Sequence, residues 1–173
     1  MSIIAKASGG NFIPCPAGIH AAVCVDVVDL GDLEVNFGGK QKVQHKIRIV
    51  WQVEELMPNN NPYTVSKRYT LSLHEKASLR KDLESWRGRS FTEEELQGFD
   101  VETVLSAGAY LNVIQEVKNG STYSNVASIM RLPKGMETPT PHGYVRVCDR
   151  EPDQAPTVDE PTEYGVTLDD VPF

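Results

Sequence analysis

Residues 40–54, KQKVQHKIRIVWQVE, alternate between polar and apolar side chains and restrict the fold more than any other stretch. The odd positions are Val43, His45, Ile47, Ile49, Trp51 and Val53, and the even positions are Lys40, Lys42, Gln44, Lys46, Arg48, Val50 and Gln52. Because successive side chains of a β-strand point to opposite faces, this pattern predicts a strand with an apolar face on the core and a basic face in solvent.

The basic side chains of such a strand recur about every 7 Å. That spacing is close to the spacing of phosphates along a nucleic-acid backbone, so the basic face could follow a nucleic acid. A solvated strand face with lysines placed for solubility explains the same pattern, and the strand alone does not decide between the two.

The charge of the chain is unevenly placed. The formal net charge is −7, and residues 149–173 alone hold eight acids and one base. Residues 1–148 hold 16 acids and 16 bases, so the body is neutral. The acids of the last segment alternate with prolines, which predicts a disordered acidic tail over residues 149–173. The small, polar residues 1–13 predict a flexible N-terminal arm.

The composition bounds the class of protein. A length of 173 residues suits one domain with a proper core and appendages. We see no apolar run of membrane-spanning length and no secretory signal, so we expect a cytoplasmic protein that does not bind membranes. The widely spaced Cys15, Cys24 and Cys148 predict reduced thiols, and no CxxC or HxxxH spacing indicates a metal or another cofactor.

The chain before the first helix predicts three strands. Residues 19–30 should form the first, with Ile19, Ala21, Val23, Val25 and Val27 on the core face. The glycines Gly38 and Gly39 predict a hairpin turn into the basic strand. Residues 63–73 should form the third strand, with Val65, Tyr69, Leu71 and Leu73 facing the core.

The period then changes to that of a helix. Ser72 and Glu75 match a capping box, and Leu79, Leu83 and Trp86 follow at helical spacing until Gly88 ends the helix. A second capping box, Thr92 and Glu95, begins a short acidic helical turn.

Two further strands, residues 110–118 and 121–132, are joined by the strong hairpin signal Asn119-Gly120. Residues 144–147 could add one edge strand. The order of three strands, a helix and a hairpin predicts a mainly β fold over residues 14–148, a five-stranded OB-fold barrel with its helix between strands 3 and 4. This fold binds oligonucleotides near its second and third strands, where the basic face lies.

Single-strand binding needs cations for phosphates and aromatic rings for bases. The candidate cations are Lys40, Lys42, Lys46, Arg48 and Arg68, and the candidate rings, chosen because they flank turns, are Phe37, Tyr63 and Tyr123. The remaining large rings, Trp51, Tyr69 and Trp86, are expected in the core. The scattered histidines and Cys24 match no catalytic arrangement, so we interpret the protein as non-enzymatic.

The last residues, Asp169, Asp170, Val171, Pro172 and Phe173, are similar to the C-terminal tip of bacterial single-stranded-DNA-binding proteins, where acids precede Ile-Pro-Phe. In that family the tip docks replication and repair enzymes. The resemblance implies that Phe173 is the anchor, that Asp169 and Asp170 make the charge contacts and that Pro172 stiffens the peptide. This chain differs in having Val171 and only two adjacent acids. A solubilising acidic tail is the alternative.

The body resembles a family of small phage and prophage proteins associated with replication and recombination modules. Three stretches show the resemblance: VSKRYTLSLHEK from Val65, LRKDLESWRG from Leu79, and LPKG from Leu132. It covers roughly residues 14–135 and implies no particular functional residue.

We therefore expect a phage single-stranded-DNA-binding protein that coats single strands and recruits replication or recombination enzymes through its tip. The alternative is an interaction module that mimics the host tail and sequesters host enzymes without binding DNA. The oligomeric state is left open, a homo-oligomer included.

Overall fold

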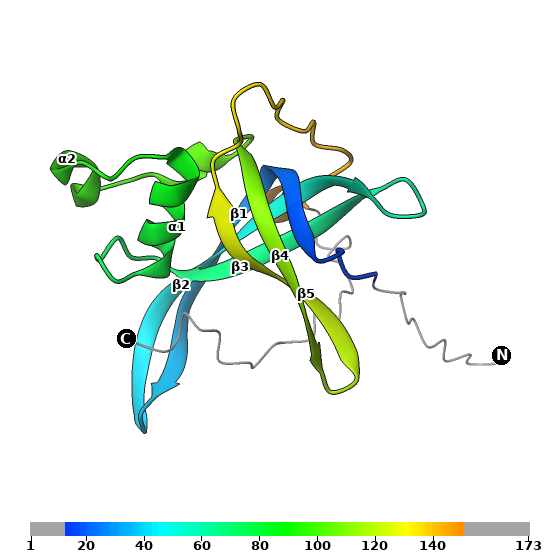
Figure 1. The fold of residues 1–173 in the computed structure, drawn as a ribbon. Helices are drawn as coiled ribbons and strands as arrows, with labels where there is room; N and C mark the ends of the chain where they lie inside the picture. Colours follow the sequence, from blue (N-terminus) through cyan, green and yellow to red (C-terminus); the bar gives the residue numbers. More distant parts are fainter. Residues whose placement is uncertain (1–12, 151–173) are drawn as a thin grey trace.

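A computed structural model describes residues 13–150 (Figure 1). Its strands are β1 (Gly18–Phe37), β2 (Lys40–Leu56), β3 (Pro62–Thr70), β4 (Gly108–Lys118) and β5 (Ser121–Met130). Its helical segments are α1 (Ser78–Arg87), α2 (Glu93–Gln97), η1 (Val101–Val104) and η2 (Val147–Asp149).

The five strands form one antiparallel sheet in the order β3-β2-β1-β4-β5. The predicted mainly β fold, with five strands and a helix between the third and the fourth, is confirmed. The ladders within residues 13–150 leave β3 and β5 unjoined, so the sheet is open and does not close into a hydrogen-bonded barrel. No helix in the same range has the length and apolar character needed to cross a membrane.

Two tight turns set the shape of the sheet. Gly38 and Gly39 have φ of 52° and 82°, and Asn119 and Gly120 have φ of 49° and 77°. Positive φ at both central residues is the geometry that matches the twist of a two-residue hairpin. Both predicted hairpins are therefore confirmed. Their turns lie beyond opposite ends of β1, because β4 pairs with the first residues of β1 and the β1–β2 turn follows its last.

One face of the sheet, the inner face, is covered by α1. Leu79, Leu83 and Trp86 of the helix pack into the core cluster that also contains Trp51 and Tyr69. The indole N–H of Trp86 donates to the carbonyl of Gly108 at 2.7 Å, which ties the helix to β4. The helix ends at Gly88, whose φ of 72° is left-handed as a C-cap requires. The predicted core positions of Trp51, Tyr69 and Trp86 are confirmed.

The predicted core face of the first strand is wrong in part: Val27 packs against the inner core, but Ile19, Val23 and Val25 do not. Ala22 and Cys24 point into the inner core, whereas Val23 and Val25 are buried on the other side of the sheet, the outer face. Ile19, predicted to be buried, is 53% exposed. Parity fails here because β1 is buried on both faces along Ala21–Cys24, and a strand of that kind shows a continuous apolar run instead of alternation.

The first capping box is also wrong. β3 ends at Thr70, and the hydroxyl of Ser72 accepts from the backbone N–H of His74 at 3.2 Å, which makes a local turn. The helix begins only at Ser78. The N-cap residue is Ala77, whose methyl group cannot accept a capping hydrogen bond. A serine can bond its own backbone two residues on as readily as it caps a helix, so the motif had two local solutions. The second box, at Thr92 and Glu95, is confirmed.

Residues 142–150, which we call the strap, cross the outer face and form no strand, so the predicted edge strand at 144–147 is wrong. Tyr144 and Val147 pack against the valines of β1 and β2. Gln52 exchanges two hydrogen bonds with the backbone of His142, at 2.8 and 2.9 Å. Hydrogen bonds and packing of side chains therefore hold the strap, where an edge strand would be held by a backbone ladder.

Asp26 binds the strap most strongly. Its carboxylate is completely buried and accepts from the Tyr144 hydroxyl at 3.1 Å, from Nε of Arg146 at 3.2 Å and from the backbone N–H of Val147 at 2.9 Å. A buried charge is tolerated only when it is paired and hydrogen-bonded in this way. We call this set of contacts the latch.

We expect Asp26→Ala to lower the free energy of unfolding by about 3 kcal/mol, near the low end for breaking a buried ion pair, because Arg146 stays partly exposed and near Glu102. Urea denaturation measures the change. Glu34→Ala removes an exposed carboxylate from the same strand and should cost no more than about 0.5 kcal/mol. Equal losses in the two variants would contradict the latch.

Candidate nucleic-acid interface

The predicted cations share one face of the sheet. Strand register places Lys40 opposite Phe37, and Arg48 opposite Arg68. Directly opposed residues in an antiparallel pair point to the same side. We call the resulting row on the outer face the basic strip. Its members are Phe37 from β1, Lys40, Lys42, Lys46 and Arg48 from β2, and Arg68 from β3.

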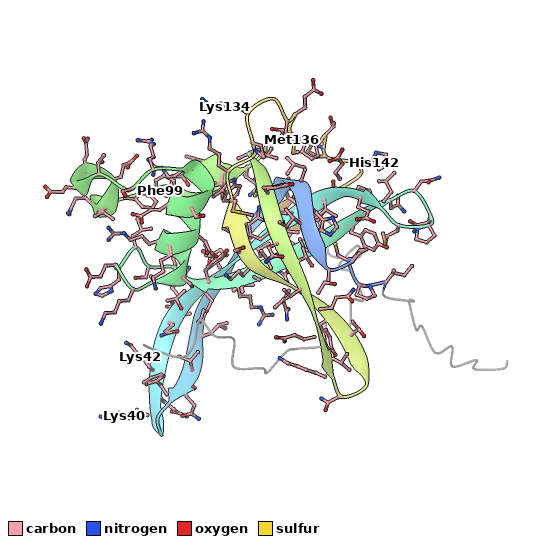
Figure 2. All side chains as sticks on the ribbon, viewed as in Figure 1. Lys40, Lys42, Phe99, Lys134, Met136 and His142 are labelled. Atoms are coloured by element: carbon pink, nitrogen blue, oxygen red, sulfur yellow. The ribbon has the colours of Figure 1, made fainter. Side chains whose placement is uncertain are left out.

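One end of the basic strip is open to solvent. Lys40 and Lys42 are exposed along the projecting β1–β2 hairpin (Figure 2), and the Phe37 side chain is 41% exposed beside them. The register pairs Val35 with Lys42 and Leu33 with Gln44, so apolar side chains of β1 lie beside polar or basic side chains of β2 on this face. Cations beside an exposed ring are what a single strand needs for its phosphates and bases.

The other end is less exposed than predicted. Lys46 is only 6% exposed, and its Nζ donates to the Thr70 hydroxyl at 2.8 Å. Arg48 is half-buried. The expectation that the whole even face of β2 shows its charge to solvent is therefore wrong. β3 lies beside this part of β2 and the strap crosses the face further on, so neighbours cover side chains that an isolated strand would expose.

Arg48 and Arg68 stand directly opposite each other in the ladder between β2 and β3. Like charges at opposed positions destabilise a sheet. Two guanidinium groups at this spacing offer planar donors that match phosphate oxygens.

The three predicted rings fall into different environments. Phe37 is exposed on the strip, and Tyr123 is half-buried on β5, away from it in the strand order. Tyr63 is only 7% exposed and belongs to the inner core, so its prediction as a surface ring is wrong. The signal was present in the sequence, because Tyr63 has the same parity as Val65 and Tyr69.

The opposite face of the β1–β2 hairpin is acidic. Register places Asp32 opposite His45 and Glu34 opposite Val43. Both ring nitrogens of His45 meet carboxylates, with Nε2 2.7 Å from Asp29 and Nδ1 3.0 Å from Asp32. The hairpin thus separates its charges by face, with lysines on one side and carboxylates on the other. The face with the lysines is the one whose charge suits a phosphate backbone.

Sequence reasoning missed the strap. Tyr144, Arg146 and Val147 are held on the outer face by Asp26, which lies 118 to 121 residues away from them in the chain. No local period marks such a contact. The proposed docking residues Asp169, Asp170, Val171, Pro172 and Phe173 lie outside the described residues.

A shallow hollow of about 480 Å³ lies between the end of β2 and the segment before the strap. Glu54 and Glu137 are among its lining residues, with His142 at one side. Two carboxylates repel phosphate, so this hollow does not extend the basic strip.

We expect His45 to titrate above its usual pKa of 6.5. Partial loss of water lowers the pKa, but the hydrogen bonds and charges of Asp29 and Asp32 outweigh this effect and raise it. Because the folded pKa is raised, the contribution to stability is complete below the unfolded pKa and is lost as the pH rises through the folded pKa. NMR titration of the imidazole measures the value.

In the same titration Asp32→Asn should lower the pKa of His45, since it removes one of the two bonded carboxylates. Glu34→Gln, a neighbour on the same face with no bond to the ring, should change it little. A His45 pKa below 6.5 in the parent would exclude the double contact in solution.

Models of known protein families and the curated proteins give no match to this chain.

Proposed function

We propose that this chain is a single-stranded-DNA-binding protein without catalytic activity that acts in phage DNA replication and recombination. One observation is the main support: strand register brings Phe37, Lys40, Lys42, Arg48 and Arg68 onto a single face of adjacent strands. A solvated surface needs no such sorting, because lysines placed for solubility can occupy either face of a hairpin.

We further propose that the fold is an OB-fold. The support is the strand order β3-β2-β1-β4-β5 together with a helix between β3 and β4 that packs on the inner face. In that fold the nucleic acid crosses the outer surface of the second and third strands. The basic strip lies on those strands, so fold and charge support the same surface.

In this arrangement the exposed hairpin and the arginine pair have different tasks. Lys40 and Lys42 attract phosphates from solvent, and Phe37 offers one ring for a base to stack on, an interaction worth about 1–3 kcal/mol. Arg48 and Arg68 bind phosphate oxygens at a fixed place on the sheet. No base-specific contact is required, so binding is tolerant of sequence and sensitive to salt.

Residues 151–173 supply the second part of the proposal. They contain seven acids and no base, and they follow Arg150 of the strap on the outer face. The final residues, Asp169 to Phe173, would dock replication or recombination enzymes. The acids before them would compete with DNA for the basic strip, because a tethered anion acts at high effective concentration.

The first test reverses charge on the strip. The variant Lys40→Glu, Lys42→Glu, Arg68→Glu should bind a fluorescently labelled oligo-dT strand at least about tenfold more weakly at low salt, and the slope of log K against log salt should shrink by about 2. Lys46 is left unchanged because a carboxylate at that buried position would disturb the sheet.

The matched control is Lys76→Glu, Lys81→Glu, Arg89→Glu, which makes the same change in net charge at exposed positions around α1. It should reduce affinity only slightly, through long-range repulsion. Equal effects of the two triple variants would show that net charge, and not the basic strip, governs binding.

The second test removes residues 151–173 and keeps the strap. DNA affinity should rise, most clearly at low salt where the acids are least screened. Deleting only Pro172 and Phe173 removes no acidic side chain and should leave DNA affinity nearly unchanged. The same deletion should abolish capture of a host enzyme that recognises single-strand-binding tails.

Weaker DNA binding after removal of residues 151–173 would contradict competition. Capture that survives loss of Pro172 and Phe173 would exclude the tip as the anchor. A parent that captures the enzyme but binds no oligo-dT would favour the sequestering module over the proposed function.

A further inference from the structure

The strap brings a second ring to the basic strip. Tyr144 packs against the cluster that contains Val28 and Val50. Val28 is the register partner of Arg48 on β1, and Val50 lies two positions further along β2 on the same face. Tyr144 therefore lies beside Arg48. Along β2 from the hairpin, this is where the strap first covers the outer face.

Arg150 lies over that ring. Its Cζ is 5.5 Å from the centroid of Tyr144, and its Nε donates to the carbonyl of Val145 at 3.1 Å. A carbonyl fixes the guanidinium without cancelling its charge. The pKa of Tyr144 agrees with this placement: burial and Asp26 raise it to about 12, while the positive charges of Arg150 and Arg48 act in the opposite direction.

The other arginine of the strap is bound differently. Arg146 contacts the buried carboxylate of Asp26 at 3.2 Å and Glu102 at 3.6 Å. Two carboxylates offset its charge, so its role is to hold the strap in place. The arginine of the latch and the arginine that lies over Tyr144 are thus separate residues, four positions apart.

We propose that Arg150, held over Tyr144, forms a phosphate-binding subsite with Arg48 and Arg68 at the end of the basic strip. The subsite rests on the proposed function and adds to it a residue from outside the five-stranded sheet. Beyond Arg48 the strap covers Val50 and binds Gln52, so a strand that follows β2 from the hairpin must leave the sheet here. A cluster of three guanidinium groups at that turning point would bind its backbone.

In this arrangement Asp26 should favour DNA binding, although its charge is negative. A carboxylate near a DNA surface normally weakens binding by repulsion. Asp26 is completely buried, and its bonds to Tyr144, Arg146 and Val147 hold the strap that positions Arg150. Removing this negative charge should therefore lower DNA affinity.

The experiment titrates the full chain into fluorescently labelled oligo-dT over a series of salt concentrations. Arg150→Ala should weaken binding about threefold to tenfold at low salt and reduce the salt slope by about 0.7, the value of one phosphate contact. Arg89→Ala is the control, because Arg89 is 65% exposed and lies after α1, on the other side of the sheet. The affinity of the Arg89→Ala variant for oligo-dT should stay within about twofold of the affinity of the parent.

Asp26→Asn, a nearly isosteric change, should also bind more weakly than the parent and should make a further Arg150→Ala change nearly silent. If Asp26→Asn does not fold, the Arg150→Ala and Arg89→Ala pair still decides the question. A parent that binds oligo-dT while Arg150→Ala matches Arg89→Ala would overturn the subsite alone. A parent that does not bind at all would overturn the proposed function together with it.

Discussion

The contact between Trp51 and Trp86 fixes which face of the sheet does what. Their ring centroids lie 5.8 Å apart, and Trp51, in the middle of β2, is completely buried. Because α1 seats on this ring, the odd positions of β2 around it must face inward, and parity then turns Lys46 and Arg48 outward. The position of the basic strip is thus set by an apolar contact on the reverse side of the same strand.

On the outer face, Asp26 holds the strap in place. A buried carboxylate is costly unless every lone pair is used, and here the three bonds come from a segment more than 100 residues away. The bonds that satisfy this charge also hold the strap across the outer face. Core packing on one side and the strap on the other therefore leave the hairpin end of β2, around Lys40 and Lys42, as its most exposed part among the described residues.

Much of this could be predicted from local pattern, and all but one of the failures share a cause. The inward-facing odd residues of 47–53, the two hairpin turns and the stripe of Leu79, Leu83 and Trp86 are local signals that the structure confirms. Burial of Lys46 depends on its neighbour across the ladder, and the strap depends on Asp26. Such contacts join residues far apart in the chain, so no period in the sequence records them. The capping box at Ser72 failed for a different reason, competition between two local structures.

The hairpin formed by the end of β1 and the start of β2 projects from the sheet as an arm. Residues 31–37 and 40–46 pair with each other beyond a register shift at Asp29–Gly31, and His45 bonds Asp29 and Asp32 on either side of that shift. Seven residues at strand rise give an arm of about 23 Å. A rotation of about 10° at the shift moves the tip by about 4 Å, nearly the distance between neighbouring strands. The bonds of one imidazole at the base of the arm thus brace a lever whose far end carries Phe37, Lys40 and Lys42.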